Sequence, residues 1–171
     1  MIITATKIPD VWIIESLCFE DHRGSFVRYW DSLIFGQDGI GPFVQDNISI
    51  SKSGVLRGLH YQERNPQGKL VAVHSGAIFD VAVDIRPNSH TFGEWVGVDL
   101  TEDDNKQLWI PPGLAHGFCV TEGPAKVHYR CTAPYDADDQ CGIRWDDPSL
   151  CIDWPVENPI LSDRDSLLPY K

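Results

Sequence analysis

The sequence predicts an all-β fold, an antiparallel two-sheet sandwich or barrel in which a jelly roll is the favoured form. Short runs of β-branched, aliphatic and aromatic residues recur along the chain, and turn pairs rich in Gly, Pro and Asn separate them. No long segment has the 3.6-residue period of an amphipathic helix. Many short strands with few helical turns are typical of sandwiches and barrels.

The elements of the first third follow from local composition. We expect one or two helical turns within residues 31–37 and a tight hairpin at Ser53-Gly54. Strands are expected at residues 2–6, 11–15, 25–30 and 43–52.

From residue 70 onward the predicted strands are closely spaced. Ser75-Gly76 and Gly123-Pro124 are among the pairs that predict turns between them, and one short helix is expected near residues 163–168. The strands are expected at residues 70–73, 77–85, 94–100, 107–110, 118–121 and 126–132.

Length and charge limit the possible functions. A chain of 171 residues is long enough for one ordinary domain with its own core, and we expect residues 1–171 to form a single domain. The net charge of −11 argues against nucleic acid as a partner, since phosphate neutralisation needs a basic face. An anionic small ligand therefore requires local cations, and Arg23, Arg57 and Lys69 are the best candidates.

The cysteines and the N-terminus predict a cytoplasmic, soluble protein. Five cysteines without a C-x-x-C spacing fit neither a disulfide framework nor a zinc site. The chain lacks a signal-peptide pattern and a run of eighteen apolar residues, so we expect no membrane association.

The stretch Val55-Leu56-Arg57-Gly58-Leu59-His60-Tyr61-Gln62 places charge inside an aliphatic segment, and Lys69 follows soon after it. A histidine that titrates near neutral pH, with cations beside it, suits an anionic substrate or a developing oxyanion. In a regular strand Arg57 and His60 face opposite sides. A bulge at Gly58 would bring them to one side. A buried histidine with surface cations is the alternative.

This stretch resembles the signature of the dTDP-4-dehydrorhamnose 3,5-epimerase family, and the similarity covers nearly the whole chain. Further motifs in the same order include residues 19–24, 44–47, 79–86, 108–118, 143–148, 152–155 and 161–165. The resemblance implies a cupin-type jelly roll and a homodimer whose N-terminal strands cross between subunits. It also implies cofactor-free epimerisation of a nucleotide-linked 4-keto-6-deoxy sugar at C3, C5 or both.

The resemblance also implies a role for each matching residue. His60 matches the general base, and Asp165 matches the carboxylate that holds it. Lys69 matches the group that stabilises the enolate, and Tyr129 matches the acid on the opposite face. These are the parts that proton removal next to a ketone requires. The implied contacts to the nucleotide diphosphate are Arg23, Gln45, Asn47, Arg57, Lys69 and His116, with Tyr135 stacking on the base.

At three positions the chain departs from the rhamnose-pathway pattern. Arg28 stands in place of a glutamate, and Gln140 stands in place of a second acid. Arg164 stands where the family often has lysine. A carboxylate accepts hydrogen bonds whereas a guanidinium donates them, so we expect a non-standard nucleotide end and a weaker preference for thymidine.

Three alternatives remain at this point. Pro111-Pro112-Gly113-Leu114-Ala115-His116 has the form of a second cupin motif, which in metal cupins supplies a histidine ligand. Gln62 stands at the position of a further ligand, and amides are poor ligands for such metals, so we expect no metal and activity that survives chelation. The others are a single-centre epimerase acting on a CDP- or GDP-linked sugar and a catalytically silent sugar-nucleotide-binding cupin.

Overall fold

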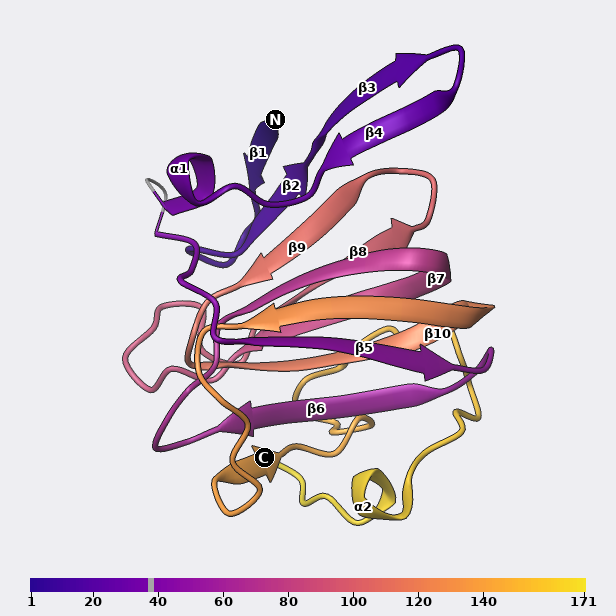
Figure 1. Cartoon of the computed structure of the whole chain (residues 1–171). Helices are drawn as coiled ribbons and strands as arrows, with labels where there is room; N and C mark the ends of the chain where they lie inside the picture. The colour runs from indigo at the N-terminus through magenta and orange to yellow at the C-terminus, as the bar shows by residue number, and fades with distance from the viewer. Residues whose placement is uncertain (37–38) are drawn as a thin grey trace.

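Two long antiparallel strands form the centre of the fold in the computed structural model, which describes residues 1–36 and 39–171 (Figure 1). β7 (Lys69–Asp84) pairs with β10 (Leu114–Cys131) along most of their length. The first part of β7 pairs with β9 (Lys106–Ile110), and its second part pairs with β8 (Trp95–Thr101). Each long strand therefore takes part in two layers.

β10 is shared in the same way. Its first part pairs with β6 (Leu56–Gln62), which continues to β11 (Gln140–Gly142). Its second part pairs with β5 (Gln45–Ser51). One layer is thus β11-β6-β10-β7-β8, and the other runs from β5 through β10, β7 and β9 to the N-terminal strands. The predicted all-β cupin jelly roll is confirmed.

The remaining elements lie at the edges. β1 (Ile2–Ala5) and β2 (Trp12–Glu15) extend the layer beyond β9. β3 (Leu17–Asp21) and β4 (Gly24–Arg28) form a separate hairpin that projects from the body in Figure 1. The helical turns α1 (Ser32–Phe35) and α2 (Asp163–Ser166) confirm the two expected helical segments, although residue 37 of the first lies outside the described residues.

Apolar residues fill the space between the layers and also form clusters on parts of the outer faces. The largest cluster joins both layers and includes Val71, Ile78, Leu108, Phe118 and Val127. A second cluster lies where the C-terminal segment packs on β6 and neighbouring strands, and Leu59, Ile143 and Trp154 belong to it. Burying this much aliphatic and aromatic surface is the main stabilising contribution.

Two predicted turns are wrong, because Ser75-Gly76 lies within β7 and Gly123-Pro124 lies within β10. The pairing of these strands shifts register between Val120 and Val127, and a Cβ added at Gly76 would lie 2.4 Å from the Glu122 carbonyl oxygen. The glycines thus allow two long strands to bend and pass from one layer to the other. Turn-forming residues produced a bulge here because a partner strand continues beside them.

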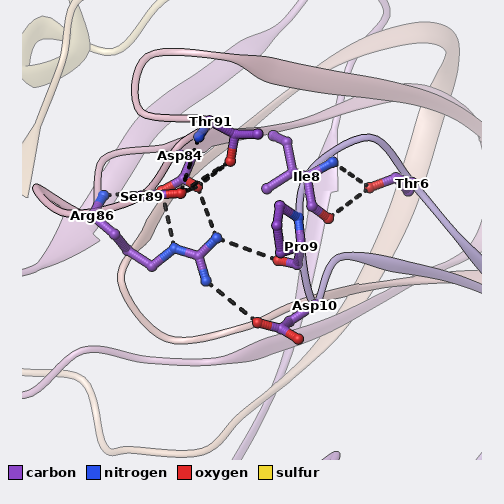
Figure 2. A network of polar contacts seen from close by, with 8 residues as sticks. All are labelled: Thr6, Ile8, Pro9, Asp10, Asp84, Arg86, Ser89 and Thr91. Carbon is purple, nitrogen blue, oxygen red and sulfur yellow. Dashed lines mark hydrogen bonds and ion pairs between the residues drawn. The ribbon is translucent and has the colours of Figure 1, made fainter.

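Asp84 at the end of β7 anchors the loop before β8 and the loop before β2 (Figure 2). Its fully buried carboxylate accepts hydrogen bonds from the Arg86 guanidinium at 2.7 and 3.0 Å and from the Ser89 and Thr91 hydroxyls at 2.7 Å. Burial alone would raise the pKa of Asp84, but these donors outweigh it and hold the pKa far below its usual value. Arg86 also pairs with Asp10 at 3.5 Å.

We expect Asp84→Asn to lower the free energy of unfolding by roughly 2–4 kcal/mol at pH 7, because it leaves Arg86 without its buried counter-charge. Since the folded pKa is lowered, the contribution is complete above the unfolded value of about 4 and is lost as the pH falls below it. Urea denaturation should therefore show a difference from the unaltered protein that narrows at about pH 3.

Asp10→Asn is the matched control, because Asp10 is an exposed partner of the same guanidinium. It should change stability by less than about 1 kcal/mol. Equal losses in the two variants would contradict the anchoring role of Asp84.

Candidate active site

A pocket of about 270 Å³ lies between the two layers. β5, β7 and β10 contribute residues from one layer, and β6 and β11 contribute residues from the other. Its lining consists of Gln45, Asn47, His60, Gln67, Lys69, Tyr129, Cys131, Tyr135 and Gln140. Seven of these residues were predicted from the sequence, so the fold brings most of the predicted site together.

A β-bulge in β6 directs His60 into this pocket. His60 pairs with His116 of β10, and Arg57 pairs with Phe118. Between these two pairs β6 therefore contains one residue more than β10. Gly58 occupies the bulge with φ of +123°, and a Cβ there would lie 2.5 Å from Gly117 Cα. The predicted bulge is confirmed, and its effect is to place Arg57 and His60 on the same side of the strand.

His60 is held by a carboxylate from the C-terminal segment. Its Nε2 lies 2.6 Å from Oδ1 of Asp165, a buried residue of α2. Because an ionised carboxylate only accepts, Nε2 donates to it, and in the neutral imidazole Nδ1 then keeps its lone pair. Burial would raise the pKa of Asp165, but the His60 contact, the Gly58 amide and the Ser162 hydroxyl hold it below its usual value.

Tyr129 and Lys69 line the pocket from the layer opposite His60. Burial raises the pKa of Tyr129, the nearby Cys131 thiol adds to this, and the Arg57 charge opposes it. Burial lowers the pKa of Lys69, which Cys131 and Asp80 partly offset. The tyrosine therefore keeps its proton at neutral pH, and the ammonium loses its proton more readily than a surface lysine does.

Behind His60 lies a second pair of the same kind. His116 is buried, and its Nε2 lies 2.7 Å from Oδ1 of the fully buried Asp80. Burial lowers the pKa of His116, and Asp80 opposes that change. The other Asp80 oxygen has no hydrogen-bond partner among the described residues. The pocket thus has a negative charge beneath it that offsets Lys69.

The remaining contacts lie around the pocket's polar end. The Arg57 Nε donates to the Ser51 hydroxyl at 3.0 Å, and the rest of this exposed guanidinium is available to an anion. Gln45 donates to Asn47 at 2.9 Å and accepts from the Tyr135 backbone N–H at 2.7 Å. Tyr135 is half exposed, so its ring can stack on a flat ligand.

Gln140 and Arg164 close the side of the pocket next to Tyr135. The Tyr135 hydroxyl donates to Gln140 Oε1 at 2.7 Å, and Arg164 Nη1 donates to the same oxygen at 2.9 Å. Arg164 Nη2 donates to the Gln140 carbonyl oxygen at 3.1 Å. These bonds tie β11 to α2, which carries Asp165.

Among the predicted binding residues, Arg23 and Arg28 lie on the β3-β4 hairpin, away from the pocket. Arg23 sits near the tip of the β3-β4 hairpin and pairs with Asp21 at 2.6 Å. Arg28 ends β4 and contacts Asp31 at 3.5 Å. The hairpin belongs to a separate two-stranded sheet, which is why these cations do not meet the others.

Three residues near the site were not predicted. Gln67 and Cys131 line the pocket, and nothing in their sequence context distinguishes them. Asp80 had a usable signal, because it is an acid within the aliphatic run 77–85. A carboxylate buried by such a strand requires a partner, and here the partner is His116.

The side chain of Gln62 supports the backbone of the site. Its amide donates to the carbonyl oxygens of Asn65 and Pro134 at 2.8 and 3.2 Å, and its Oε1 accepts from the Asp136 N–H at 2.9 Å. Over residues 1–36 and 39–171, no group of three His, Cys, Asp or Glu side chains is arranged to hold a metal ion. The same residues include no helix long and apolar enough to cross a membrane.

A jelly roll with a carboxylate-held histidine, a tyrosine and a lysine in one pocket defines a cupin equipped for acid–base chemistry. The profile of dTDP-4-dehydrorhamnose 3,5-epimerase matches residues 5–170. The chain belongs to this family.

Individual relatives agree with that assignment. The dTDP-4-dehydrorhamnose 3,5-epimerase of Shigella flexneri is 50% identical over 169 residues, covering 96% of this chain and 93% of the relative. A dTDP-6-deoxy-D-glucose-3,5-epimerase from Legionella pneumophila, solved in complex with dTDP-4-keto-L-rhamnose, superposes with a TM-score of 0.95. It is 46% identical, and the match covers 98% of this chain and 91% of the Legionella chain.

A more distant solved structure is a 3'-monoepimerase from Streptomyces bikiniensis in complex with dTDP-quinovose. It is 34% identical, its TM-score is 0.89, and the match covers 96% of this chain and 85% of the other. The same fold therefore occurs in proteins described as acting at one centre and at two.

We expect Gly58→Ala to destabilise the protein by at least about 2 kcal/mol more than Gly24→Ala. Gly24 is the matched control, because its φ of +129° is similar to that of Gly58 and a Cβ there meets nothing within 4 Å. Both variants share the backbone strain, but a Cβ at Gly58 also collides with β10. Urea denaturation measures the difference, and equal losses would show that the close approach to Gly117 does not fix the bulge.

Proposed function

We propose that the protein inverts one or two carbon centres of a dTDP-linked 4-keto-6-deoxy sugar by proton removal and return, without a cofactor. The main support for this proposal is that a carboxylate-held histidine and a protonated tyrosine line one pocket from different layers. The dTDP-4-keto-L-rhamnose bound to the Legionella neighbour supports the substrate class.

In this proposal His60 takes the proton from a carbon beside the ketone through Nδ1, the nitrogen that Asp165 leaves free. The bond electrons move to the ketone oxygen and form an enolate. Lys69, with His116 behind it, stabilises that negative charge. Tyr129 then gives its proton to the same carbon from the other face, which inverts the centre.

The nucleotide diphosphate occupies the polar end of the pocket. Arg57, Gln45 and Asn47 bind the phosphates and sugar, and the Tyr135 ring stacks on the base. Arg164 and Gln140 border the part of the pocket that holds the base. The local cations Arg57 and Lys69 allow an anion to bind despite the overall charge of −11.

Arg23 and Arg28 act on the pocket of a second copy in a homodimer. The β3-β4 hairpin that carries them exposes Leu17, Phe19 and Phe26 at 39%, 53% and 66% of their surface. Large apolar side chains on a projecting hairpin are typical of a contact surface. A hairpin exchanged between two copies buries these side chains and delivers both guanidinium groups to the partner's pocket.

The protein acts as a single domain in the cytoplasm, in deoxysugar biosynthesis that supplies cell-surface polysaccharide. Cys18, Cys119, Cys131, Cys141 and Cys151 are free thiols, which suits a reducing compartment.

A single-centre epimerase is the second candidate, favoured by the likeness to the Streptomyces 3'-monoepimerase. Deuterium incorporation from D2O into dTDP-4-keto-6-deoxyglucose, read by NMR at C3 and C5 separately, distinguishes the two. Label at both carbons supports the 3,5-epimerase, and label at one carbon supports the alternative. A binding protein without catalysis gives no label.

We expect His60→Ala to lower the rate of deuterium exchange by roughly 10²–10⁴-fold while dTDP binding is retained.

In Tyr129→Phe the base still removes and returns a proton on one face, so exchange should persist better than inversion. The ratio of label incorporated to epimer formed should therefore rise in this variant.

His90→Ala and Tyr170→Phe are the matched controls, because both side chains are exposed and lie outside the pocket. Neither should alter exchange. Full exchange in His60→Ala, or an unchanged ratio in Tyr129→Phe, would contradict the proposed roles.

The pH dependence of kcat/KM should report Lys69. Because the pKa of Lys69 is lowered, its charged form disappears at a lower pH than that of a surface lysine, and activity should fall on the alkaline side. A guanidinium stays protonated over this range, so the residual activity of Lys69→Arg should lack this alkaline decline.

Lys126→Arg is the control, since Lys126 is exposed on the same strand as Tyr129. Its profile should match that of the unaltered protein. If Lys69→Arg declines at the same pH as the unaltered protein, another group controls the alkaline limb.

A further inference from the structure

We propose that Gln140 determines nucleobase specificity by donating a hydrogen bond to a carbonyl oxygen of the base. This inference rests on the proposed function and concerns the same pocket. It identifies the polarity of one contact, namely a donor on the protein and an acceptor on the ligand, which is the opposite of what an acidic residue offers at this place.

The orientation of the Gln140 amide is fixed by its neighbours. Arg164 Nη1 lies 2.9 Å from one amide atom, and the Tyr135 hydroxyl lies 2.7 Å from the same atom. A guanidinium has no acceptor, so the amide atom facing Arg164 must be the oxygen. The hydroxyl of Tyr135 then also donates to that oxygen, and both lone pairs of Oε1 are occupied.

The amide nitrogen is consequently left for the ligand. Gln140 Nε2 has no hydrogen-bond partner within residues 1–36 and 39–171, and Gln140 lines the pocket beside Tyr135. Rotating the amide would set its NH2 group against the Arg164 guanidinium, which places donors against donors. The pocket therefore presents one or two N–H groups where the base would lie against Tyr135.

A donor at this position selects among the groups on a pyrimidine edge. Thymine and uracil carry a carbonyl oxygen on each side of a single N–H. A carboxylate in place of Gln140 would accept from that ring N–H, whereas the amide nitrogen pairs with one of the two carbonyl oxygens. The ligand class is thus a nucleoside diphosphate whose base offers a carbonyl oxygen at the Tyr135 end of the pocket.

Analogues of dTDP test this contact one group at a time. Calorimetry would measure binding of dTDP, 2-thio-dTDP, 4-thio-dTDP and N3-methyl-dTDP to the unaltered protein and to Gln140→Glu. A thiocarbonyl is a poor acceptor, so the unaltered protein should lose about fivefold in affinity for one of the two thio analogues. Gln140→Glu should lose nothing with that analogue.

The N3-methyl analogue tests the reverse polarity. Gln140→Glu should lose about tenfold more affinity for it than the unaltered protein does, because a carboxylate acceptor loses its N–H partner. The same analogue ranking in both proteins, or no thio penalty in the unaltered protein, would overturn the inference.

Arg164→Met is a second variant that tests how the amide is held. Without the guanidinium the Gln140 amide can rotate, so the thio penalty should fall to less than half of its original value. An unchanged penalty would contradict the argument that Arg164 fixes the donor, and this holds whether or not Gln140→Glu folds.

Deuterium exchange by the unaltered protein is measured in parallel. If the unaltered protein exchanges deuterium but has the same analogue ranking as Gln140→Glu, the role of Gln140 is wrong and the proposed function still stands. Absence of both exchange and dTDP binding removes both proposals.

Discussion

The close approach of β6 and β10 at Gly58 and Gly117 is the constraint on which the site depends. Two glycine backbones meet where any Cβ would collide, and the extra residue this allows in β6 turns His60 toward the pocket. The same bulge brings the Gly58 amide near Asp165, which holds the imidazole. Local backbone geometry therefore sets both the direction and the tautomer of the His60 side chain.

Three buried carboxylates hold other side chains and loops of this protein in place. Asp165 holds His60, Asp80 holds His116, and Asp84 fastens two loops through Arg86. Each is buried, and each has a charged or polar donor that offsets the cost of its desolvation. The result is a set of rigid attachments around the pocket, so that polar side chains from distant parts of the sequence keep fixed positions.

The pocket combines an ordinary acid–base interior with an unusual outer end. His60, Lys69, Tyr129 and Asp165 form the inner part, where burial raises the tyrosine pKa and lowers that of the lysine. At the outer end the Gln140 oxygen accepts from Arg164 and Tyr135, so this neutral amide turns its N–H donors toward the pocket. The two ends of the pocket are joined through α2, because Arg164 and Asp165 are adjacent in one helical turn.

The sequence by itself determined the strand-rich fold, and its resemblance to the epimerase family predicted most of the residues that line the pocket. Alternating apolar runs, turn residues and a glycine between Arg57 and His60 predicted strands and a bulge, since these depend on local backbone preferences. Local signals could not predict that Ser75-Gly76 and Gly123-Pro124 are bends within long strands, because a neighbouring strand decides whether a glycine ends a strand or bends it. They also gave no sign of the short strands β3 and β11.

Tertiary structure alone decided which partners the polar groups found. Asp165 lies 105 positions from His60 in the chain, and Arg164 lies 24 positions from Gln140. Such contacts depend on how the C-terminal segment folds back over β6, which no short sequence pattern encodes. The sequence could name Gln140 as an amide, but only the positions of Arg164 and Tyr135 decide which end of that amide faces the ligand, because a guanidinium can only donate.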